Sequence, residues 1–429
     1  MNGKTGVSDK IDIFDNAKND VRMIFRKKKT EVSGSLNYLA WQKFKKNKLS
    51  MVGLGFILLA ALVAVMGYII TPDKSSFSNN QLLEISTRKP GYKVQMLKVR
   101  KNEPEQKIGF FNIMFFGKTD SYNYIPINNF RFDDDKIIIE EFNDIAGEEL
   151  FYSSLPIADV LYPLKYDNEV FRDKDQLSIT CINDKKQTVT ISEAQKEIVE
   201  KNIIYKKFYL GTDRFGRDLL SRLLIGTRIS LSVGFISVFI SLLIGITLGA
   251  IAGFYRGKID EIIMWLINVI WSIPTLLMVI AITLVIGKGF WQIFIAVGLT
   301  MWVEVARVVR GQVLSVREKE YIEAARALGF SDLRIIFKHI LPNIVSPVII
   351  ISAANFATAI LLEAGLSFLG IGVQPPVPSW GTMIKEHYGY IIMDKAYLAI
   401  LPGLVIMMLV LSFTLLGNGL RDALDTKNK

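Results

Sequence analysis

Long uncharged apolar runs alternate with polar segments along this chain of 429 residues. A helix that crosses a bilayer needs roughly 20 apolar residues, and six runs reach or approach that length. They lie at 49–72, 229–255, 262–287, 289–303, 343–362 and 397–420. The first run alone favours membrane insertion by roughly 3–6 kcal/mol. It is longer than the core of a signal peptide and follows a polar segment, so we do not expect it to be cleaved.

Residues 73–205 contain no such run and are rich in Asn, Asp and Lys. Alternating or β-branched stretches at 92–99 and 136–140 favour strands, and the two stretches that flank Asn183–Lys186 favour a hairpin. A short helix is expected at 193–201. About 130 residues can bury a core of their own. The pattern therefore predicts an all-α polytopic membrane protein with six transmembrane helices and an inserted α+β domain.

The charge distribution predicts how the chain is oriented. Half of the residues are hydrophobic, mean hydropathy is +0.31 and net charge is +10. Cytoplasmic flanks of membrane proteins carry excess Lys and Arg. Such clusters lie at 26–29, 43–48, 256–258, 307–338 and 421–429. The positive surplus thus indicates topology and not nucleic-acid binding. It predicts a multi-pass protein with both termini in the cytoplasm and residues 73–205 outside.

A polar, helix-forming hairpin separates the fourth and fifth runs. Residues 318–327 are mostly strong helix formers, and Gly329 stands where a left-handed C′ glycine ends a helix. Ser331 is a suitable N-cap for a second short helix, and Pro342 ends the polar stretch. Such a rigid hairpin reads as a handle for a cytosolic partner. An interfacial helix without a partner, a DNA-binding helix-turn-helix and a plain linker are the competing interpretations.

The hairpin resembles the EAA motif of ABC importer permeases in Glu323-Ala324-Ala325, Gly329 and Leu341-Pro342. His339 departs from the general motif and agrees with the branch that imports peptides. Three further segments, at 211–230, 365–381 and 416–422, resemble the C-type permease of oligopeptide, dipeptide and nickel importers. The resemblance covers 41–72 and 208–425, and it implies a type I ABC importer permease fold. The length of the insertion departs from the family.

The residue pattern predicts a division of the chain, and the resemblance adds the permease core and a set of partners. Residues 1–48 would be a cytosolic basic, amphipathic tail, with 1–30 disordered and the part near Trp41 and Phe44 on the inner membrane face. Residues 49–72 would be the first span, 73–205 the extracytoplasmic domain, and 206–429 the permease core with five spans and the coupling hairpin (316–342). Partners would be a homologous B-type permease, two ATPase subunits that hydrolyse ATP, an extracytoplasmic solute-binding protein, a peptide and the lipids of the cytoplasmic (inner) membrane.

By residue-by-residue match, the ATPase-coupling interface would comprise Tyr321, Glu323, Ala324, Ala325, Gly329, Leu341 and Pro342. Two groups outside the membrane are candidates for an outer gate or for docking of the binding protein. They are Asp213, Gly216, Arg217 and Asp218 before the second run, and Pro375, Pro376 and Trp380 between the fifth and sixth. A capped turn is an equal interpretation of the first group. Packing against the partner permease is an equal interpretation of the second.

Other side chains change the picture less. Glu304 and Glu363 stand near run ends, where exposure to lipid headgroups is expected, and Pro274 should kink the third span. Gly245, Gly249 and Gly253 favour close helix packing. Cys181 is the only cysteine, His339 and His387 are far apart, and neither a metal site, a cofactor nor catalytic residues are expected. Gly117–Thr119 mimics the end of a phosphate loop without its first glycine.

Three functions stay open at this stage. A permease that imports short peptides is favoured, with nickel or another small solute as a variant. A membrane-anchored receptor or scaffold would instead place the function in 73–205, and the hairpin would then be dispensable. An ion-coupled transporter would require carboxylates deep in the spans, which the sequence places only near their ends.

Overall fold

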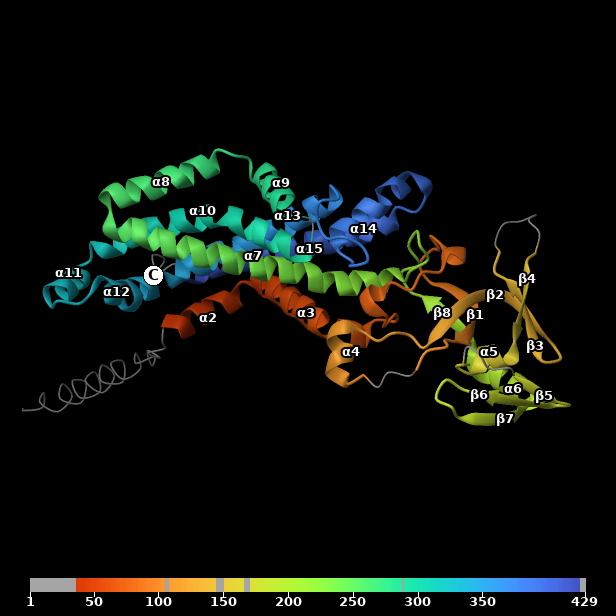
Figure 1. Cartoon of the computed structure of the whole chain (residues 1–429). Helices are drawn as coiled ribbons and strands as arrows, with labels where there is room; N and C mark the ends of the chain where they lie inside the picture. Colours follow the sequence, from red (N-terminus) through yellow and green to blue (C-terminus); the bar gives the residue numbers. More distant parts are fainter. Residues whose placement is uncertain (1–35, 105–107, 144–149, 166–169, 288, 425–429) are drawn as a thin grey trace, which may run out of the picture.

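The computed structural model describes residues 36–104, 108–143, 150–165, 170–287 and 289–424. It is an elongated bundle of helices with β-sheets at one end (Figure 1). Short helices α11 (Glu320–Ala327) and α12 (Asp332–Ile335) lie at the opposite end, and α2 (Leu36–Lys46) lies toward the same end (Figure 1). These two extremities are called the sheet end and the hairpin end below.

Five helical runs are long and apolar enough to cross a membrane. They are α3 (Lys48–Ile70), α7 (Leu219–Tyr255), α10 (Phe290–Arg317), a continuous run from Asp332 through α13 (Val345–Phe368), and α15 (Tyr397–Leu424). The prediction of these spans is confirmed, but their helices extend further. The second begins at Leu219 and the fourth continues to Arg317, because good helix formers continue the hydrogen-bond ladder beyond the apolar core. Residues 1–30, predicted as a disordered tail, lie outside the described residues.

The third predicted span is broken. Helices α8 (Gly257–Trp271) and α9 (Thr275–Ile286) meet at an angle of 92°. Pro274 stands at the break, immediately before α9. Proline has no N–H to donate and clashes with the preceding turn, so the helix stops instead of bending. The prediction of one kinked span is corrected to a bent pair, and the chain has five or six spans depending on whether that pair crosses.

Helices α7 and α10 pack with their backbones nearly in contact. A Cβ atom on Gly249 would lie 2.5 Å from the carbonyl oxygen of Ala306, and one on Gly245 would lie equally close to the Cβ of Val305. Gly253 meets Val313 in the same way. Small residues allow this approach where no water drives helices together. The predicted role of the three glycines is confirmed, and their partner is α10.

The inserted domain contains two antiparallel sheets. Strands β1 (Tyr92–Arg100), β2 (Tyr122–Asp133), β3 (Lys136–Glu141), β4 (Tyr152–Pro156) and β8 (Ile203–Phe208) form a sheet in the order β4-β3-β2-β1-β8. Strands β5 (Phe171–Asp173), β6 (Gln176–Thr180) and β7 (Lys186–Thr190) form the second. The predicted hairpin is β6–β7. The large sheet extends to Phe208, three residues beyond the domain boundary expected at 205.

Alternating side chains from both sheets make the core of this domain. Leu97, Ile137, Ile139 and Leu177 are fully or almost fully buried there. Helices α5 (Ile157–Leu161) and α6 (Ile191–Glu197) add to the same core. The predicted helix near 193 is therefore present. It begins earlier, with a capping box between Thr190 and Glu193.

The segment before the first span, which was predicted to be amphipathic, is helical. Helix α2 (Leu36–Lys46) carries Trp41 stacked on Phe44, with ring centroids 5.7 Å apart. Phe44 is buried, and its ring lies where a Cβ on Gly419 of α15 would reach it. Trp41 remains 44% exposed. This part of the tail thus packs on the C-terminal span with one aromatic and presents the other.

We expect Gly249→Ala to destabilise the protein by about 1–3 kcal/mol, because the new methyl group overpacks the α7–α10 contact. Thermal unfolding of the purified protein in detergent measures this. Gly311→Ala in α10 is the matched control, since a Cβ there meets no atom within 4 Å. Equal melting temperatures for the two variants would contradict the close-contact interpretation.

Candidate functional site

The hairpin turns at Gly329, as predicted. Gly329 has φ +74°, and its N–H donates to Arg326 O while the N–H of Phe330 donates to Ala325 O. This pair of bonds is the Schellman arrangement, in which a left-handed residue satisfies the last carbonyls of a helix. Ser331 stands at the N-cap of α12, but its side chain makes no capping bond. The turn thus depends on the glycine and not on the serine.

One face of α11 is buried and the other is free. Ile322 and Ala325 pack with Ile335, Ile336 and Phe254 in a core cluster beneath the hairpin. Tyr321, Glu323, Ala324 and Gly329 are exposed. These four residues are predicted coupling residues, and all of them are accessible to a partner. The fifth predicted coupling residue in this helix, Ala325, is buried.

Three large apolar side chains lie exposed on the hairpin beside those residues. Leu328, Leu333 and Phe337 are 73%, 66% and 64% exposed. Sequence reasoning missed them, although their spacing around the turn was available as a signal. We call these three residues with Tyr321 the apolar hairpin face. Apolar side chains gathered on a protruding surface are typical of a docking site.

The second arm of the hairpin runs into the fifth span without a joint. A π turn (Ile336–Ile340) and a 3-10 turn (Leu341–Ile344) connect α12 to α13 in one helical run. Pro342 is exposed near the start of the 3-10 turn, and Leu341 is half-buried. The prediction of two separate short helices is therefore wrong for the second one. Proline is tolerated because its missing N–H falls in the first turn of a helical segment.

Ion pairs fasten the hairpin end. Arg310 of α10 donates two hydrogen bonds to Asp260 of α8, at 2.5 and 2.6 Å. Arg256 pairs with Glu318 just before α11. His339, the residue that agrees with the peptide-importing branch of the family, stacks on Phe330 with ring centroids 5.9 Å apart. The first pair joins α10 to α8, the second lies beside the start of the hairpin, and the ring stack lies within the hairpin. The apolar cluster that contains Ile322 and Ile335 packs the hairpin on the bundle.

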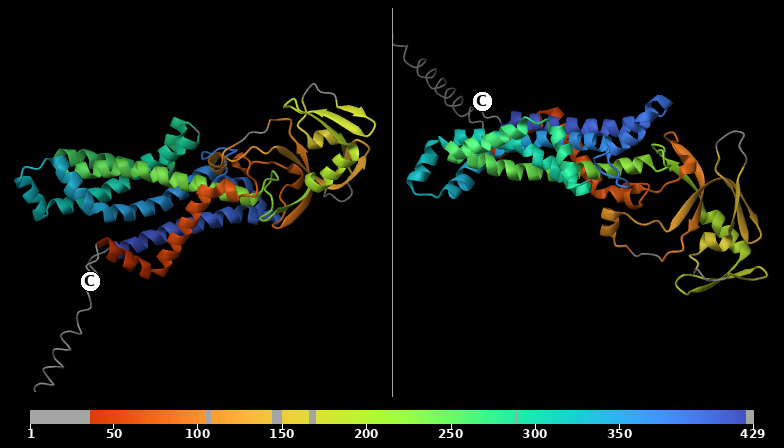
Figure 2. Two further views of the ribbon diagram at one scale, coloured as in Figure 1. Left: turned by 90° about the horizontal axis from the view of Figure 1, so that it is seen from below. Right: turned by 45° about the horizontal axis from the view of Figure 1, so that its top comes forward.

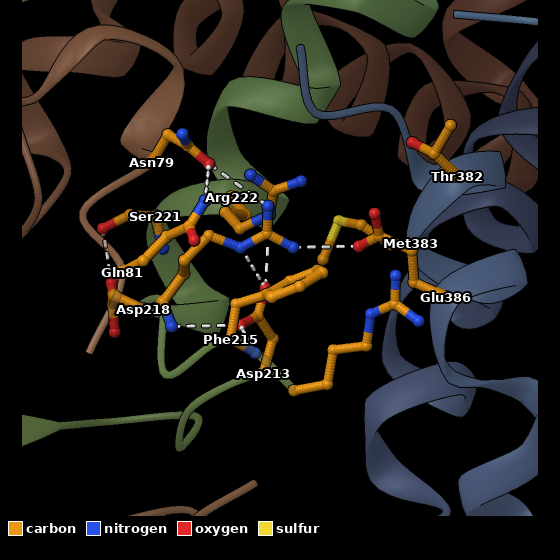
Figure 3. Close-up of polar contacts among 12 residues, drawn as sticks. Asn79, Gln81, Asp213, Phe215, Asp218, Ser221, Arg222, Thr382, Met383 and Glu386 are labelled. Atoms are coloured by element: carbon orange, nitrogen blue, oxygen red, sulfur yellow. Dashed lines mark hydrogen bonds and ion pairs between the residues drawn. The ribbon is translucent and has the colours of Figure 1, made fainter. Parts of the chain in front are cut away.

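A buried charged cluster lies at the sheet end. Arg217 Nε donates to Asp213 Oδ2 at 2.6 Å and Nη2 donates to Glu386 Oε2 of α14 (Trp380–His387) at 2.9 Å. Its Nη1 donates to Asn79 Oδ1 at 3.2 Å. Arg222 Nε lies 3.6 Å from Asp213 Oδ2. Figure 3 shows that the labelled side chains of the cluster come from the segment after α3, from the start of α7 and from α14.

This cluster contains four of the residues predicted as a gate or docking element. Asp213, Arg217 and Asp218 are 0%, 2% and 3% exposed, and Gly216 is also buried. Asp218 caps α7 by accepting from the N–H of Ser221. A Cβ on Gly216, which has φ +70°, would overlap the carbonyl of Leu82. Asp218 thus caps a turn that leads into α7, and these side chains are buried in this structure. Their role as an outer gate or docking element stays a prediction.

The second predicted docking group, between the fifth and sixth runs, has both exposed and buried members. Pro375 and Pro376 are exposed, whereas Trp380 is fully buried. Its Nε1 donates to Leu223 O at 3.0 Å, and its indole lies over Gly226 of α7. Trp380 therefore packs within its own subunit, and only the two prolines remain accessible.

Asp213, Glu386 and His387 offer ligand atoms within 4.8 Å of one another, a grouping that sequence reasoning missed. Two arginines already balance the two carboxylates. Burial lowers the pKa of His387, and burial raises the pKa of Asp218 against the hydrogen bonds from Ser221. His387 Nδ1 lies 2.7 Å from Met383 O, which assigns the proton to that nitrogen. The arrangement suits a guanidinium between carboxylates better than a divalent cation.

A cavity of about 90 Å³ lies beside the broken pair α8–α9. Its lining includes Trp271, Met278, Thr300, Glu304 and Thr358, from α8, α9, α10 and α13. Glu304 is exposed, and no ion pair of its carboxylate is found within the described residues. Its neighbour Val305 contacts Gly245, near the middle of the apolar part of α7 (229–254). The expectation that Glu304 lies at a span end is therefore wrong.

The expectation of headgroup exposure is also wrong for Glu363. This residue of α13 is fully buried and accepts a hydrogen bond from Ser367 Oγ at 2.7 Å. Ser230 of α7 lies 3.5 Å from its other oxygen. Hydroxyl groups thus satisfy a carboxyl group inside the bundle. The position of Glu363 along the sequence does not reveal that Ser230 of α7 lies beside it.

Comparison with known proteins identifies the family. Residues 245–429 match the model described as "Binding-protein-dependent transport system inner membrane component", and residues 35–86 match "N-terminal TM domain of oligopeptide transport permease C". The glutathione transport system permease protein GsiD of Pectobacterium atrosepticum is 44% identical over 221 residues, covering 52% of this chain and 73% of that protein.

The dipeptide transport system permease protein DppC of Alkalihalophilus pseudofirmus is 43% identical over 221 residues, covering 52% of this chain and 72% of that protein. A solved structure of the MetNI methionine ABC transporter in an inward-facing conformation matches with a TM-score of 0.41 and 19% identity, covering 48% of this chain and 97% of that one. On the identity and coverage of the sequence relatives, the chain belongs to the family of binding-protein-dependent transport system inner membrane components. It is a multi-pass membrane protein with an inserted α+β domain.

We expect Arg217→Met to destabilise the protein by about 3–5 kcal/mol, because it removes the partner of the largely buried Glu386 and leaves Arg222 as the one arginine of the cluster beside two buried carboxylates. Thermal unfolding of the purified protein measures the loss. Arg172→Met is the matched control, since Arg172 pairs with Asp134 on the surface, where ion pairs contribute little. If the two variants had the same melting temperature, the buried cluster would not be a determinant of stability.

Proposed function

We propose that this chain is the C-type permease subunit of an ATP-driven ABC importer that moves short peptides across the cytoplasmic membrane. The membership of the family and the names of the relatives, which concern dipeptides and glutathione, support a peptide substrate. Nickel or another small solute is the alternative cargo. By this proposal the subunit is not catalytic, and partner ATPases hydrolyse ATP.

The observation that carries the proposal is the exposed hairpin. It presents the apolar hairpin face and Glu323 at the end opposite to the sheets, and its second arm is continuous with α13. Figure 2 shows the same separation of sheets and hairpin in two further views. A partner that grips this face moves the spans directly, since no flexible linker intervenes. A receptor whose function resides in the insertion would not need such an element.

The proposal assigns sides and partners. Both ends of the described chain would lie in the cytoplasm with the hairpin, and the sheets would lie outside. The apolar hairpin face, together with Glu323, Ala324 and Gly329, would bind an ATPase subunit. A homologous B-type permease, a second ATPase and a solute-binding protein would complete the complex. The exposed Pro375 and Pro376 are the part of the predicted outer docking group that stays available to such partners.

We further propose that the cavity beside α8–α9 belongs to the translocation path. Transport sites often lie near the bilayer midplane beside discontinuous helices, and this cavity lies beside one. A charged group facing lipid is costly, so Glu304 is better placed facing an aqueous path. Its carboxylate would accept hydrogen bonds from the ammonium group of a peptide during passage.

We predict that Leu333→Glu weakens association with the ATPase by more than about tenfold, since a charge replaces an apolar contact at a docking face. Co-purification of the ATPases with the permease and peptide uptake into proteoliposomes measure the effect. Uptake should fall with association, while insertion of the permease into the membrane stays normal.

The control for this variant is Leu83→Glu at the sheet end. Leu83 is 64% exposed and Leu333 is 66% exposed. The two substitutions therefore introduce the same charge at equally exposed positions at opposite ends of the molecule. Retention of the ATPases by Leu333→Glu, or their loss from both variants, would contradict the assignment of the hairpin as the coupling element.

We predict that Glu304→Gln lowers uptake of a free-amine dipeptide by about tenfold, the effect of losing one charge-assisted hydrogen bond worth roughly 1.4 kcal/mol. Uptake per ATP hydrolysed by the reconstituted complex measures this. Glu261→Gln in α8 is the control, because Glu261 is an exposed carboxylate outside the cavity lining. Unchanged uptake by Glu304→Gln would remove the cavity from the path and leave the importer assignment standing.

A further inference from the structure

Helix α4 (Phe110–Phe116) is unusually apolar for a segment of the inserted domain. Its sequence is Phe-Phe-Asn-Ile-Met-Phe-Phe, without a charge. Phe110, Phe111 and Phe116 are 63%, 73% and 70% exposed, and Phe115 is 47% exposed. Four phenylalanine rings on one short helix form a patch that a water-facing surface rarely carries.

A single guanidinium fixes the depth of this helix. Arg228 of α7 donates to Met114 O at 3.0 Å and Phe115 O at 2.6 Å, both in α4. The same group donates to Ala64 O at 2.7 Å and Val65 O at 3.1 Å in α3. The end of α4 therefore lies level with Ala64–Val65. That level is about 8 Å inside the end of α3 at Ile70, given a rise of 1.5 Å per residue.

Further contacts hold α4 in this place. Lys118 N donates to Lys74 O at 2.8 Å, and Ser76 Oγ donates to Phe116 O at 3.2 Å. Gly117, with φ +80°, passes so close to the Tyr68 ring of α3 that a Cβ would lie 3.0 Å from it. The helix is thus docked on the bundle by its C-terminal backbone and by the Phe115 ring beside Arg228, while Phe110, Phe111 and Phe116 stay exposed.

The surface that continues from α4 indicates what covers the rings. The adjoining span α3 exposes Leu58, Leu62 and Val65 at 61%, 56% and 49%. Figure 1 shows α4 beside the end of α3, between the bundle and the sheets. Lys74 and Lys118 flank the apolar patch, where they suit lipid phosphates.

We propose that α4 is an interfacial helix whose phenylalanines insert into the lipid leaflet at the sheet end and anchor the inserted domain to the membrane. Its apolar rings are then removed from water by acyl chains, and Arg228 satisfies carbonyls that would otherwise lack partners at that depth. The inference requires only that α3 spans the bilayer. It stands or falls independently of the cargo and of the ATPase.

Fluorescence quenching by spin-labelled lipids tests the proposal. In a Cys181→Ala background, which removes the only cysteine, Phe111→Cys carries an environment-sensitive nitrobenzoxadiazole label. The full complex is placed in nanodiscs of phosphatidylcholine with or without lipid that is spin-labelled on the upper acyl chain. We expect the label at 111 to lose most of its fluorescence in the spin-labelled discs.

Phe171→Cys in β5 is the matched control, because Phe171 is an equally exposed phenylalanine (66%) of the same domain. Its fluorescence should not change. A second position in α4, Phe116→Cys, repeats the test if labelling at 111 disturbs the protein. Quenching at 111 and 116 no greater than at 171 would overturn the proposal, whether water or a partner subunit then covers the helix.

Discussion

The close contact between α7 and α10 is the constraint on which the rest of the structure depends. Three glycines spaced four apart let the backbones meet, and a methyl group at Gly249 would already collide with Ala306 O. In a bilayer no hydrophobic effect drives helices together, so packing at such short range has to hold them. Both helices end at the hairpin end, and α10 leads directly into the hairpin. The position of the hairpin is therefore tied to the packing of these two helices and to the apolar cluster that joins it to their ends.

The sequence predicted those features that depend on local chemistry. Apolar runs gave the spans, the glycine spacing gave the packing face of α7, and Gly329 gave the turn of the hairpin. Each depends on residues that are neighbours along the chain or along one helix face. Pro274 was recognised as a perturbation, but the 92° break is set by how α8 and α9 pack on α10, which a single residue does not reveal.

Features that join distant segments were not predictable in the same way. Arg217 and Glu386 are 169 positions apart, and nothing in either motif indicates that they meet. Glu363 was placed near a span end by counting along the helix, whereas its burial follows from hydroxyl groups on α7 and α13. The exposure of Leu328, Leu333 and Phe337 likewise depends on which face of the hairpin the core cluster covers. Sequence periodicity over so few residues does not decide this.

The hairpin and the buried charged cluster lie at opposite ends of the bundle, and helices α13, α14 and α7 connect them. The run from Asp332 through α13 connects the hairpin to the sheet end, and Glu386 of α14 then joins Arg217 at the start of α7. Helix α7 returns over 37 residues, about 55 Å, to the hairpin end, where it packs on α10. Apart from the loop 369–379 between α13 and α14, each link is a helix or a buried contact, so a displacement of the hairpin is transmitted along the bundle. It has to shift α13 and α7 against each other, and the contacts of the buried cluster are where that shift is resisted at the sheet end.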